Sequence, residues 1–434
     1  MTLARAIQVY QATRQATWLL MMLALARAHV SLGEVGNLEA LRYLGLLLTG
    51  PLVAAASTAY LRIRQTSAHP DRWFVLMTLL TLLAGVTVVG YLDYAGTPLA
   101  RILLDFTRLD YALPFGVYLL GALIAALVSY EAIADGAYGR LLSFTAISYT
   151  WQLLSFVVPL WYGLPMAAVL WGLASTVLPR LAFLLWRYGR TRDAHLPPRQ
   201  ERRLFASQVG AILAYSVFGL VVGAIDLYLV GHTATDAEAA VGIWRYGAQE
   251  IPFVLGIVGG ISATALAERG GGIAPMLSAM RRRTRLATHG LLALAAILMV
   301  ASPYLFRYVF GEDFYPAHVV FNTMLLVLPS RLVLTQPLLI SEDMQGHMVG
   351  VGFGESLINV AVSLALLPSL GLLGVAVGTV VAFTAERSAY VYLLSRRGYR
   401  LGDYVRWREL AGLSVGLVIL YLGTTDLAAL RSLS

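Results

Sequence analysis

The chain of 434 residues is 58% hydrophobic and 13% charged, which excludes an ordinary soluble globule and indicates a polytopic membrane protein. It has no cysteine, which excludes disulfides, thiolate metal sites and a cysteine nucleophile. All 32 basic residues are arginine and the net charge is +8, but most of the arginines lie in short segments beside apolar runs. That placement is typical of membrane topology, so we expect no nucleic-acid partner.

Apolar runs long enough to cross a bilayer of about 30 Å recur along the chain. We predict an all-α fold with twelve spans and a further C-terminal segment, residues 410–430, that either spans the membrane or lies in its interface. The first span ends in an A-x-A pattern, but Arg27 and the residues after it favour a retained helix over a cleaved signal peptide. The predicted spans are residues 12–30, 38–60, 73–92, 111–133, 141–160, 164–186, 204–230, 239–266, 286–308, 316–340, 348–367 and 372–394.

Arginine sets the expected orientation. With a cytoplasmic N-terminus, 22 arginines fall on the inner side and six on the outer side. Because short cytoplasmic loops are enriched in arginine, we predict a cytoplasmic N-terminus in the cell membrane. The longest inner linker, residues 187–203, is rich in charge and contains Pro197-Pro198, as a connector between two lobes does.

These observations divide the chain into an N-terminal six-helix lobe at residues 1–190, a linker at 191–203, a C-terminal six-helix lobe at 204–396, and a basic loop with a hydrophobic segment at 397–434. We expect the two lobes to surround a central cavity. The hairpin at residues 204–266 carries Asp226, Arg245 and Glu250 within its apolar runs. Charges in hydrocarbon are costly and usually face a bundle interior or a wet cavity, so we interpret this hairpin as part of a solute or lipid pathway.

The other spans also carry charge. Arg331 lies deep in the tenth span between Pro329 and Pro337, where broken helices can admit water. We expect the pathway to include Arg27, Asp226, Arg245, Glu250 and Arg331, with Asp226 and Arg245 paired across the hairpin. Glu355 and Arg387 are predicted to form a structural ion pair, and Arg180, near a helix end, to extend its charge to the interface.

The sequence offers few other candidate sites. His232 and His347 have no second ligand at a metal spacing, so we expect no metal site. The glycines at 270–272 lack the lysine of a phosphate-binding loop, and we expect no cofactor. The run Arg281-Arg282-Arg283 is interpreted as a topology determinant that meets anionic headgroups, with a specific lipid site as the alternative.

Several short motifs resemble those of polysaccharide flippases within the multidrug, oligosaccharidyl-lipid and polysaccharide exporter superfamily, over roughly residues 10–400. The resemblance implies two six-helix lobes around a cavity that opens alternately to either side. Trp244 replaces the usual tyrosine, and Arg245 departs from the pattern. The motifs are Leu32-Gly33-Glu34-Val35-Gly36, Asp226 with Val241-Gly242-Ile243-Trp244, Phe310-Gly311-Glu312-Asp313-Phe314 with Ala317, and Leu357-Ile358-Asn359-Val360 with Leu366-Leu367-Pro368, Gly371 and Gly374-Val375-Ala376.

The resemblance implies a transporter that flips a polyprenyl-diphosphate-linked glycan, and arginines in or beside the pathway suit a diphosphate. The alternative is a drug or cation antiporter of the same superfamily, in which Asp226, Glu250 and Glu355 would be the functional residues. A membrane glycosyltransferase or polymerase is less favoured because the largest outer segment, residues 93–110, is short, so we expect no enzyme. The expected partners are the lipid-linked glycan, membrane lipids and, as an open question, a coupling ion, with the protein a monomer.

Overall fold

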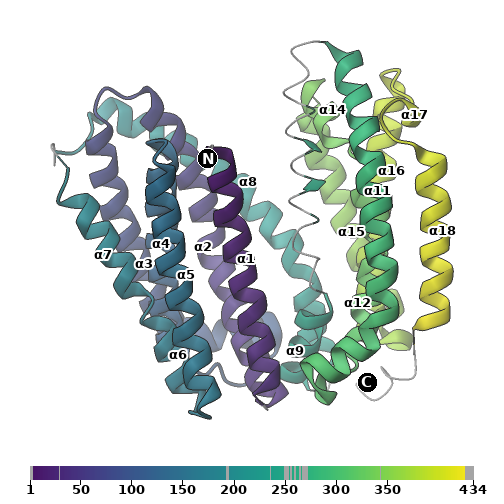
Figure 1. Cartoon of the computed structure of the whole chain (residues 1–434), viewed down its shortest axis with the longest axis horizontal. Helices are drawn as coiled ribbons and strands as arrows, with labels where there is room; N and C mark the ends of the chain where they lie inside the picture. Colours follow the sequence, from purple (N-terminus) through teal and green to yellow (C-terminus); the bar gives the residue numbers. More distant parts are fainter. Residues whose placement is uncertain are drawn as a thin grey trace. The chain divides into compact units, whose positions relative to one another are not determined.

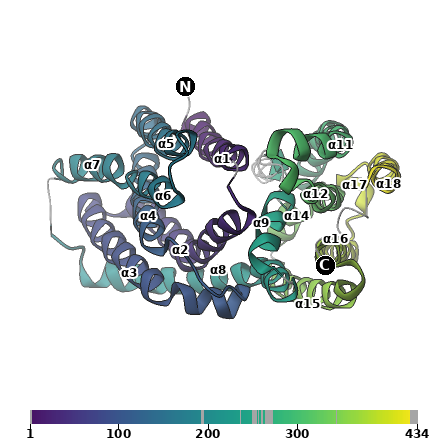
Figure 2. The ribbon, with the colours of Figure 1, turned by 90° about the horizontal axis from the view of Figure 1, so that it is seen from below.

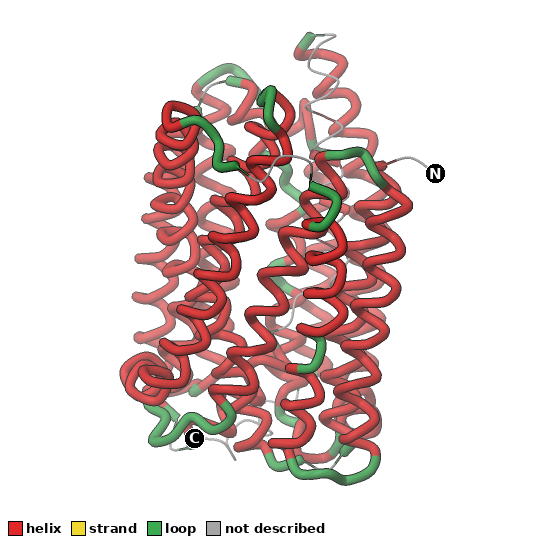
Figure 3. Tube along the Cα trace, turned by 90° about the vertical axis from the view of Figure 1, so that its left-hand side faces the viewer, coloured by secondary structure: helices red, strands yellow, loops and turns green. Residues whose placement is uncertain are grey.

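The computed structural model describes residues 3–28, 30–191, 195–234, 236–248, 254, 257–258, 261–262, 265, 272–342 and 344–425. Within these residues all regular elements are helical and there is no strand (Figure 3). Nine of the described helices are long and apolar enough to cross a membrane. The all-α, polytopic prediction is therefore confirmed.

Those nine helices coincide with predicted spans two to six and nine to twelve. The first and seventh predicted spans fall on helices α1 (Leu3–Arg27) and α8 (Arg199–Thr233). The eighth begins with α9 (Ala237–Gly247), and most of its remainder lies outside the described residues. The C-terminal segment forms α18 (Trp407–Thr424), whose 18 residues extend about 27 Å at 1.5 Å per residue.

The helices form two compact units, Met1–Ala224 and Ile225–Ser434, so the boundary falls inside α8. The start of α8 belongs to the first unit because Glu201 accepts hydrogen bonds there. Its carboxylate receives the indole N–H of Trp73 at 2.9 Å and the hydroxyl of Ser67 at 3.1 Å. The lobe bounds expected from the sequence stay a prediction, because a compact unit is not necessarily a body that moves as one.

The first unit is built around α4, which lies against α2, α3, α5, α6 and α7. Helix α1 lies beside α5, and α3 beside α4 (Figures 1 and 2). The sixth predicted span is divided into α6 and α7 at Ser175 and Thr176. After α1, the helices of this unit are α2 (Leu32–Thr66), α3 (Pro70–Leu104), α4 (Ala112–Ala134), α5 (Tyr138–Trp161), α6 (Met166–Ala174) and α7 (Val177–Tyr188).

In the second unit α15 and α16 form a long hairpin and pack against each other more extensively than any other two helices, and α12 packs on α16. Helix α18 lies along α11 (Figure 1). A π-helical turn, η2 (Leu305–Phe310), and a 3₁₀ turn, η3 (Glu312–Phe314), follow α11. The remaining helices are α11 (Ile273–Tyr304), α12 (Ala317–Leu325), α13 (Leu328–Arg331), α14 (Gln336–Ser341), α15 (Gln345–Leu370), α16 (Leu372–Arg396) and α17 (Leu401–Tyr404).

Proline breaks the tenth span as the sequence predicts. Pro329 lies in the first turn of α13 and Pro337 in the first turn of α14, so this span consists of three short helices. Proline has no N–H to continue the preceding helix and is well tolerated only at a helix start. Arg331, the last residue of α13, is therefore placed at a break in the helical backbone.

Glycine fixes the approach of α15 to α16. Gly371 joins the two helices with φ of +53°, a left-handed conformation that favours glycine. Gly378 on α16 faces Ser363 on α15. A Cβ at position 378 would lie 2.1 Å from the hydroxyl and 3.0 Å from the backbone nitrogen of Ser363. Only a residue without a side chain allows this contact, and it brings polar residues of the two helices to the same place.

Candidate functional site

The polar centre of the second unit is the carboxylate of Asp226 on α8. Its Oδ1 accepts from the amide nitrogen of Asn359 on α15 at 2.6 Å, and its Oδ2 accepts from the hydroxyl of Thr379 on α16 at 2.9 Å. Asn359 is in turn fixed by Ser363, whose hydroxyl donates to the amide oxygen at 3.1 Å. Thr379, Asn359 and Ser363 are all buried. Close packing at Gly378 thus delivers two neutral donors to one carboxylate.

This arrangement corrects the predicted pairing of Asp226 with Arg245. Among the described residues, Asp226 has hydrogen bonds from neutral side chains and no ion pair. Each of its oxygens accepts one hydrogen bond, from Asn359 or from Thr379, which the sequence-based prediction did not consider. Arg245 is half-buried in the last turn of α9. Neighbouring Tyr246 packs against Phe314 with ring centroids 4.4 Å apart.

The same residues bring together a group of oxygen atoms. It comprises the Asp226 carboxylate, the Asn359 amide oxygen, the hydroxyls of Ser363 and Thr379, and the carbonyl of Val375, to which Thr379 lies at 3.1 Å. Hard cations prefer carboxylate, carbonyl and hydroxyl oxygens. In the described part of the chain there is no group of three or more His, Cys, Asp or Glu side chains that could hold a metal ion. Asn359 turns its amide nitrogen to Asp226 and its amide oxygen to Ser363, so that oxygen does not point to the Asp226 carboxylate.

A second charged group of this unit contains Arg331, Glu355, Glu386 and Arg387. The guanidinium of Arg331 is half-buried and lies over the ring of Phe383, 4.1 Å from its centroid. Arg387 pairs with Glu386 at 3.4 Å and donates to the hydroxyl of Thr335 at 3.4 Å. Arg331 therefore lies half-buried at the predicted helix break, and its place in a transport pathway stays a prediction.

The predicted ion pair between Glu355 and Arg387 is not among the ion pairs of the described residues. Arg387 takes the carboxylate of Glu386, the residue before it on α16. Glu355 acts on Arg387 and Arg331 at longer range, through electrostatic attraction. Two further predicted pathway residues are less informative: Arg27 is the exposed last residue of α1, and Glu250 lies outside the described residues.

Arg180 in the first unit is fully buried, so the expectation that its charge reaches the interface is wrong. Its side chain is 1% exposed and donates through Nε to Ser148 at 3.0 Å and through Nη2 to Gln152 at 2.5 Å. Ser148 and Gln152 lie four residues apart and therefore share one face of α5. The rings of Tyr118 and Tyr149 flank the guanidinium at 5.6 and 6.0 Å. These acceptors and ring faces replace water as partners.

Aromatic rings link two more arginines to Arg180, and we define Arg14, Arg42 and Arg180 as the first-unit arginine group. Arg14 lies 6.0 Å from the centroid of the Tyr10 ring, which packs against Tyr149 with centroids 6.1 Å apart. Arg42 lies over the ring of Trp18 at 4.1 Å and pairs with Glu39 at 2.5 Å. Trp18 itself meets Tyr118 edge to face, with centroids 6.0 Å apart. The sequence showed Arg14 and Arg42 near the ends of apolar runs, but only packing relates them to Arg180.

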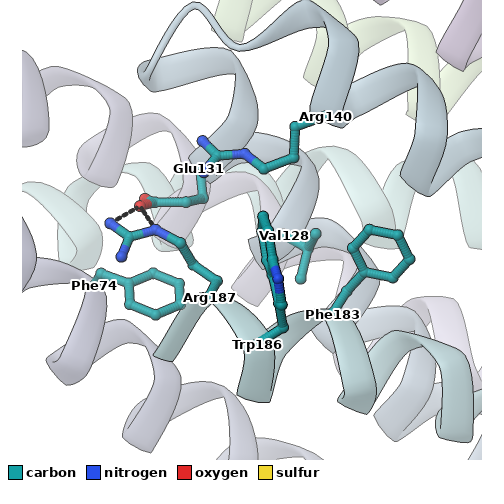
Figure 4. Close-up of a pocket in the computed structure, with 7 residues that line it drawn as sticks. All are labelled: Phe74, Val128, Glu131, Arg140, Phe183, Trp186 and Arg187. Carbon is teal, nitrogen blue, oxygen red and sulfur yellow. Dashed lines mark hydrogen bonds and ion pairs between the residues drawn. The ribbon is translucent and has the colours of Figure 1, made fainter. Parts of the chain in front are cut away.

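A third polar cluster joins the ends of α2, α3, α4, α5 and α7. The buried carboxylate of Glu131 accepts from Tyr60, from Arg64 at 2.7 Å and from Arg187 at 2.7 Å. Arg187 also pairs with Asp71 at 3.0 Å. Glu131 and Arg187 border a small pocket lined by aromatic side chains (Figure 4).

Asp135 extends this cluster beyond the end of α4. Its carboxylate pairs with Arg64 at 2.7 Å and with Arg140. Burial raises the pKa of Asp135, but the bonds and charges of Arg140 and Arg64 outweigh burial and lower the pKa below its usual range. Asp135 is therefore ionised at neutral pH. The cluster has the features of a structural fastening between helices.

No family model matches the chain, and no curated protein matches it. Solved structures do. A multidrug resistance MATE family transporter of the MOP superfamily, in an inward-facing conformation, superposes with a TM-score of 0.69 over 95% of this chain and 99% of its own, at 15% identity. The lipid II flippase MurJ, in an inward closed conformation, gives 0.68 over 95% and 91%, at 11% identity.

The chain has the fold of these transporters. A third structure, a MOP superfamily transporter from Pyrococcus furiosus, gives a TM-score of 0.61 over 95% of both chains, at 16% identity. Its description states that a reversed polarity of the binding pocket suggests a different function. Membrane transport proteins of one fold thus differ in the polarity of their binding residues, and the buried charges of this chain are the features to compare.

Proposed function

We propose that this protein is an alternating-access transporter of the cell membrane that flips a polyprenyl-diphosphate-linked oligosaccharide or polysaccharide precursor. The fold supports a transporter, because the similar structures include multidrug transporters and a lipid flippase and match over 95% of the chain. No part of the proposal requires catalysis. The N-terminus is placed in the cytoplasm, and the protein is expected to work as a monomer.

The observation that supports an anionic substrate is the first-unit arginine group. The rings of Tyr10, Trp18, Tyr118 and Tyr149 link the three arginines, and Arg42 also pairs with Glu39. Arg180 is held by neutral partners, so its charge is not cancelled by a carboxylate at ion-pair distance among the described residues. A diphosphate that leaves water needs positive partners, and guanidinium groups bind phosphate oxygens with bidentate geometry at any physiological pH.

Arg331 is proposed as the corresponding group of the second unit. It is half-buried at a helix break and lies over Phe383. A cation over an aromatic ring is attracted by the ring face, which helps to fix the position of the guanidinium. Arg27, Arg245 and Glu250 remain proposed pathway residues on the sequence argument, with Arg245 toward the outer mouth.

Asp226 is proposed to couple transport to a cation. Its carboxylate, which lies beside the hydroxyl oxygen of Thr379, can bind a proton or a small hard cation. Binding there would neutralise a charge that is costly in a low-dielectric interior. A ligand that binds one conformation better than the other shifts the balance between them, as alternating access requires.

The test is transport by purified protein in proteoliposomes with a fluorescent lipid-diphosphate oligosaccharide. We expect Arg331→Ala to abolish flipping while protein abundance stays normal, and Arg331→Lys to restore it only in part because the planar fork is lost. Arg202→Ala, an exposed arginine at the start of α8, is the control and should flip normally. Normal flipping by Arg331→Ala would remove Arg331 from the mechanism.

Transport of cationic drugs is the second candidate function, and a specific observation favours it. Two carboxylates, Asp226 and Glu386, and two arginines, Arg331 and Arg387, act on Glu355, so this group of five charges contains three acids and two bases. The same proteoliposomes should then accumulate a fluorescent organic cation, and Asp226→Asn together with Glu355→Gln should stop it. Cation transport without lipid flipping would replace the first proposal by the second.

A further inference from the structure

The cytoplasmic ends predicted for α11 and α18 carry a basic surface that the proposed transport mechanism does not use. Arg281, Arg285 and His289 are spaced by four residues and lie along one face of α11. Arg406 and Arg408 stand at the start of α18, which packs on α11 (Figure 1). All five side chains are exposed. We define them, together with Glu409, as the α11–α18 basic cluster.

One carboxylate organises the cluster. Glu409 accepts from Arg285 Nε at 3.1 Å and from Arg406 Nη1 at 2.9 Å, and His289 Nε2 lies 3.7 Å away. Two guanidinium groups from different helices are thereby held side by side. Because the cluster contains four arginines and one carboxylate, it keeps a positive charge after this pairing.

The arginines retain binding capacity. A guanidinium has five N–H donors, and in the described contacts Arg285 and Arg406 each use one of them. Phosphate oxygens match the remaining forks, and charge-assisted bonds of this kind are roughly twice as strong as neutral ones. A structure that served only to set topology would need the charges but not their fixed positions across two helices.

The surroundings distinguish a lipid from a free anion. Leu286, beside Arg285 on α11, is 80% exposed, and Leu413, one turn after Glu409 on α18, is 39% exposed. Trp407 is 47% exposed and lies under the guanidinium of Arg408 at 5.5 Å. An interfacial tryptophan and exposed leucines next to fixed arginines suit a molecule with an anionic phosphate head and acyl chains.

We propose that the α11–α18 basic cluster is a binding site for an anionic phospholipid, which inserts its phosphate between Arg285 and Arg406 and lays its chains along the two helices. The lipid would fasten α18 to α11 from the cytoplasmic leaflet. This site is separate from Arg331 and Asp226, so it does not depend on which cargo the protein transports.

The test uses the full-length protein in a neutral detergent, with phosphatidylglycerol or phosphatidylcholine added and bound lipid counted by native mass spectrometry. We expect phosphatidylglycerol to bind preferentially and Arg285→Gln/Arg406→Gln to weaken that binding by roughly tenfold or more, since each arginine near anionic lipid contributes to affinity. The matched control, Arg202→Gln/Arg203→Gln, changes two exposed arginines at the start of α8 and should keep the preference.

A second variant guards against a folding defect. Arg281→Gln/Arg408→Gln leaves the bonds to Glu409 intact and should weaken phosphatidylglycerol binding as well. The proposal would be overturned if the parent protein bound phosphatidylglycerol and phosphatidylcholine equally. It would also be overturned if Arg285→Gln/Arg406→Gln and Arg281→Gln/Arg408→Gln both kept the preference for phosphatidylglycerol. The proposal would also be overturned if inorganic phosphate displaced phosphatidylglycerol and the acyl chains added nothing to the affinity, because the site would then bind a free anion.

Discussion

Two charges of opposite sign, the half-buried Asp226 and the buried Arg180, are held by neutral partners. Asp226 in the second unit receives hydrogen bonds from Asn359 and Thr379, and Arg180 in the first unit donates to Ser148 and Gln152. Burying a charge without an ionic partner is costly unless hydrogen bonds replace water. Charges kept in this way remain able to attract a ligand of opposite sign, which is why both support a transport role.

The cost of losing Arg180 can be measured. Arg180→Ala should lower thermal stability in detergent, because Ser148 and Gln152, both fully buried, would lose their partner. An unsatisfied buried polar group costs about 1–3 kcal/mol. Arg190→Ala removes an exposed guanidinium that lies 3.8 Å over the Trp186 ring and should cost about 1 kcal/mol or less. Equal melting of Arg180→Ala and the parent protein would show that Arg180 is not needed by this core.

At the scale of elements, breaks and close contacts place the polar residues. Proline divides the tenth span into α12, α13 and α14 and leaves Arg331 at a helix end. Glycine brings α15 against α16, so that Asn359 and Thr379 reach one carboxylate. In the first unit the Glu131 cluster joins the ends of five helices, and its function is to hold them together.

Glu131→Gln tests that fastening. The neutral amide would leave Arg64 and Arg187 without their shared carboxylate, and breaking a buried ion pair costs about 3–5 kcal/mol. We expect a large drop in the unfolding temperature of the detergent-solubilised protein. Glu312→Gln, in an exposed pair with Arg307, is the control and should cost about 1 kcal/mol or less. A stability loss no greater than that of the control would contradict the role assigned to Glu131.

At the scale of the whole molecule, the orientation in the membrane stays a prediction from arginine placement. The chain has no cysteine, so single cysteines can report it. Gln200→Cys, exposed in the predicted cytoplasmic linker segment, should resist an impermeant maleimide in intact cells. Tyr162 is 77% exposed and follows the end of α5 that is predicted to lie outside the cell, so Tyr162→Cys should label rapidly. The reverse pattern would invert the predicted topology.

The sequence by itself determined the class of the protein, the positions of most of its helices and the break in the tenth span. These features depend on local properties: a run of about 20 apolar residues must cross a bilayer as a helix, and proline must interrupt it. The resemblance to flippases likewise predicted the transporter fold that the solved structures confirm. Charges in the spans marked Asp226 and Arg331 as residues to examine.

Only the tertiary structure decided the partners of those charges. Asp226 binds Asn359 and Thr379, which are 133 and 153 residues away in the chain, and not the arginine of its own hairpin. Arg180, expected at the interface, is sealed among α4, α5 and α7. The reason is that a polar partner is chosen by how closely two helices pack and which faces they turn to each other. Those quantities arise between distant segments, and hydropathy along the chain does not contain them.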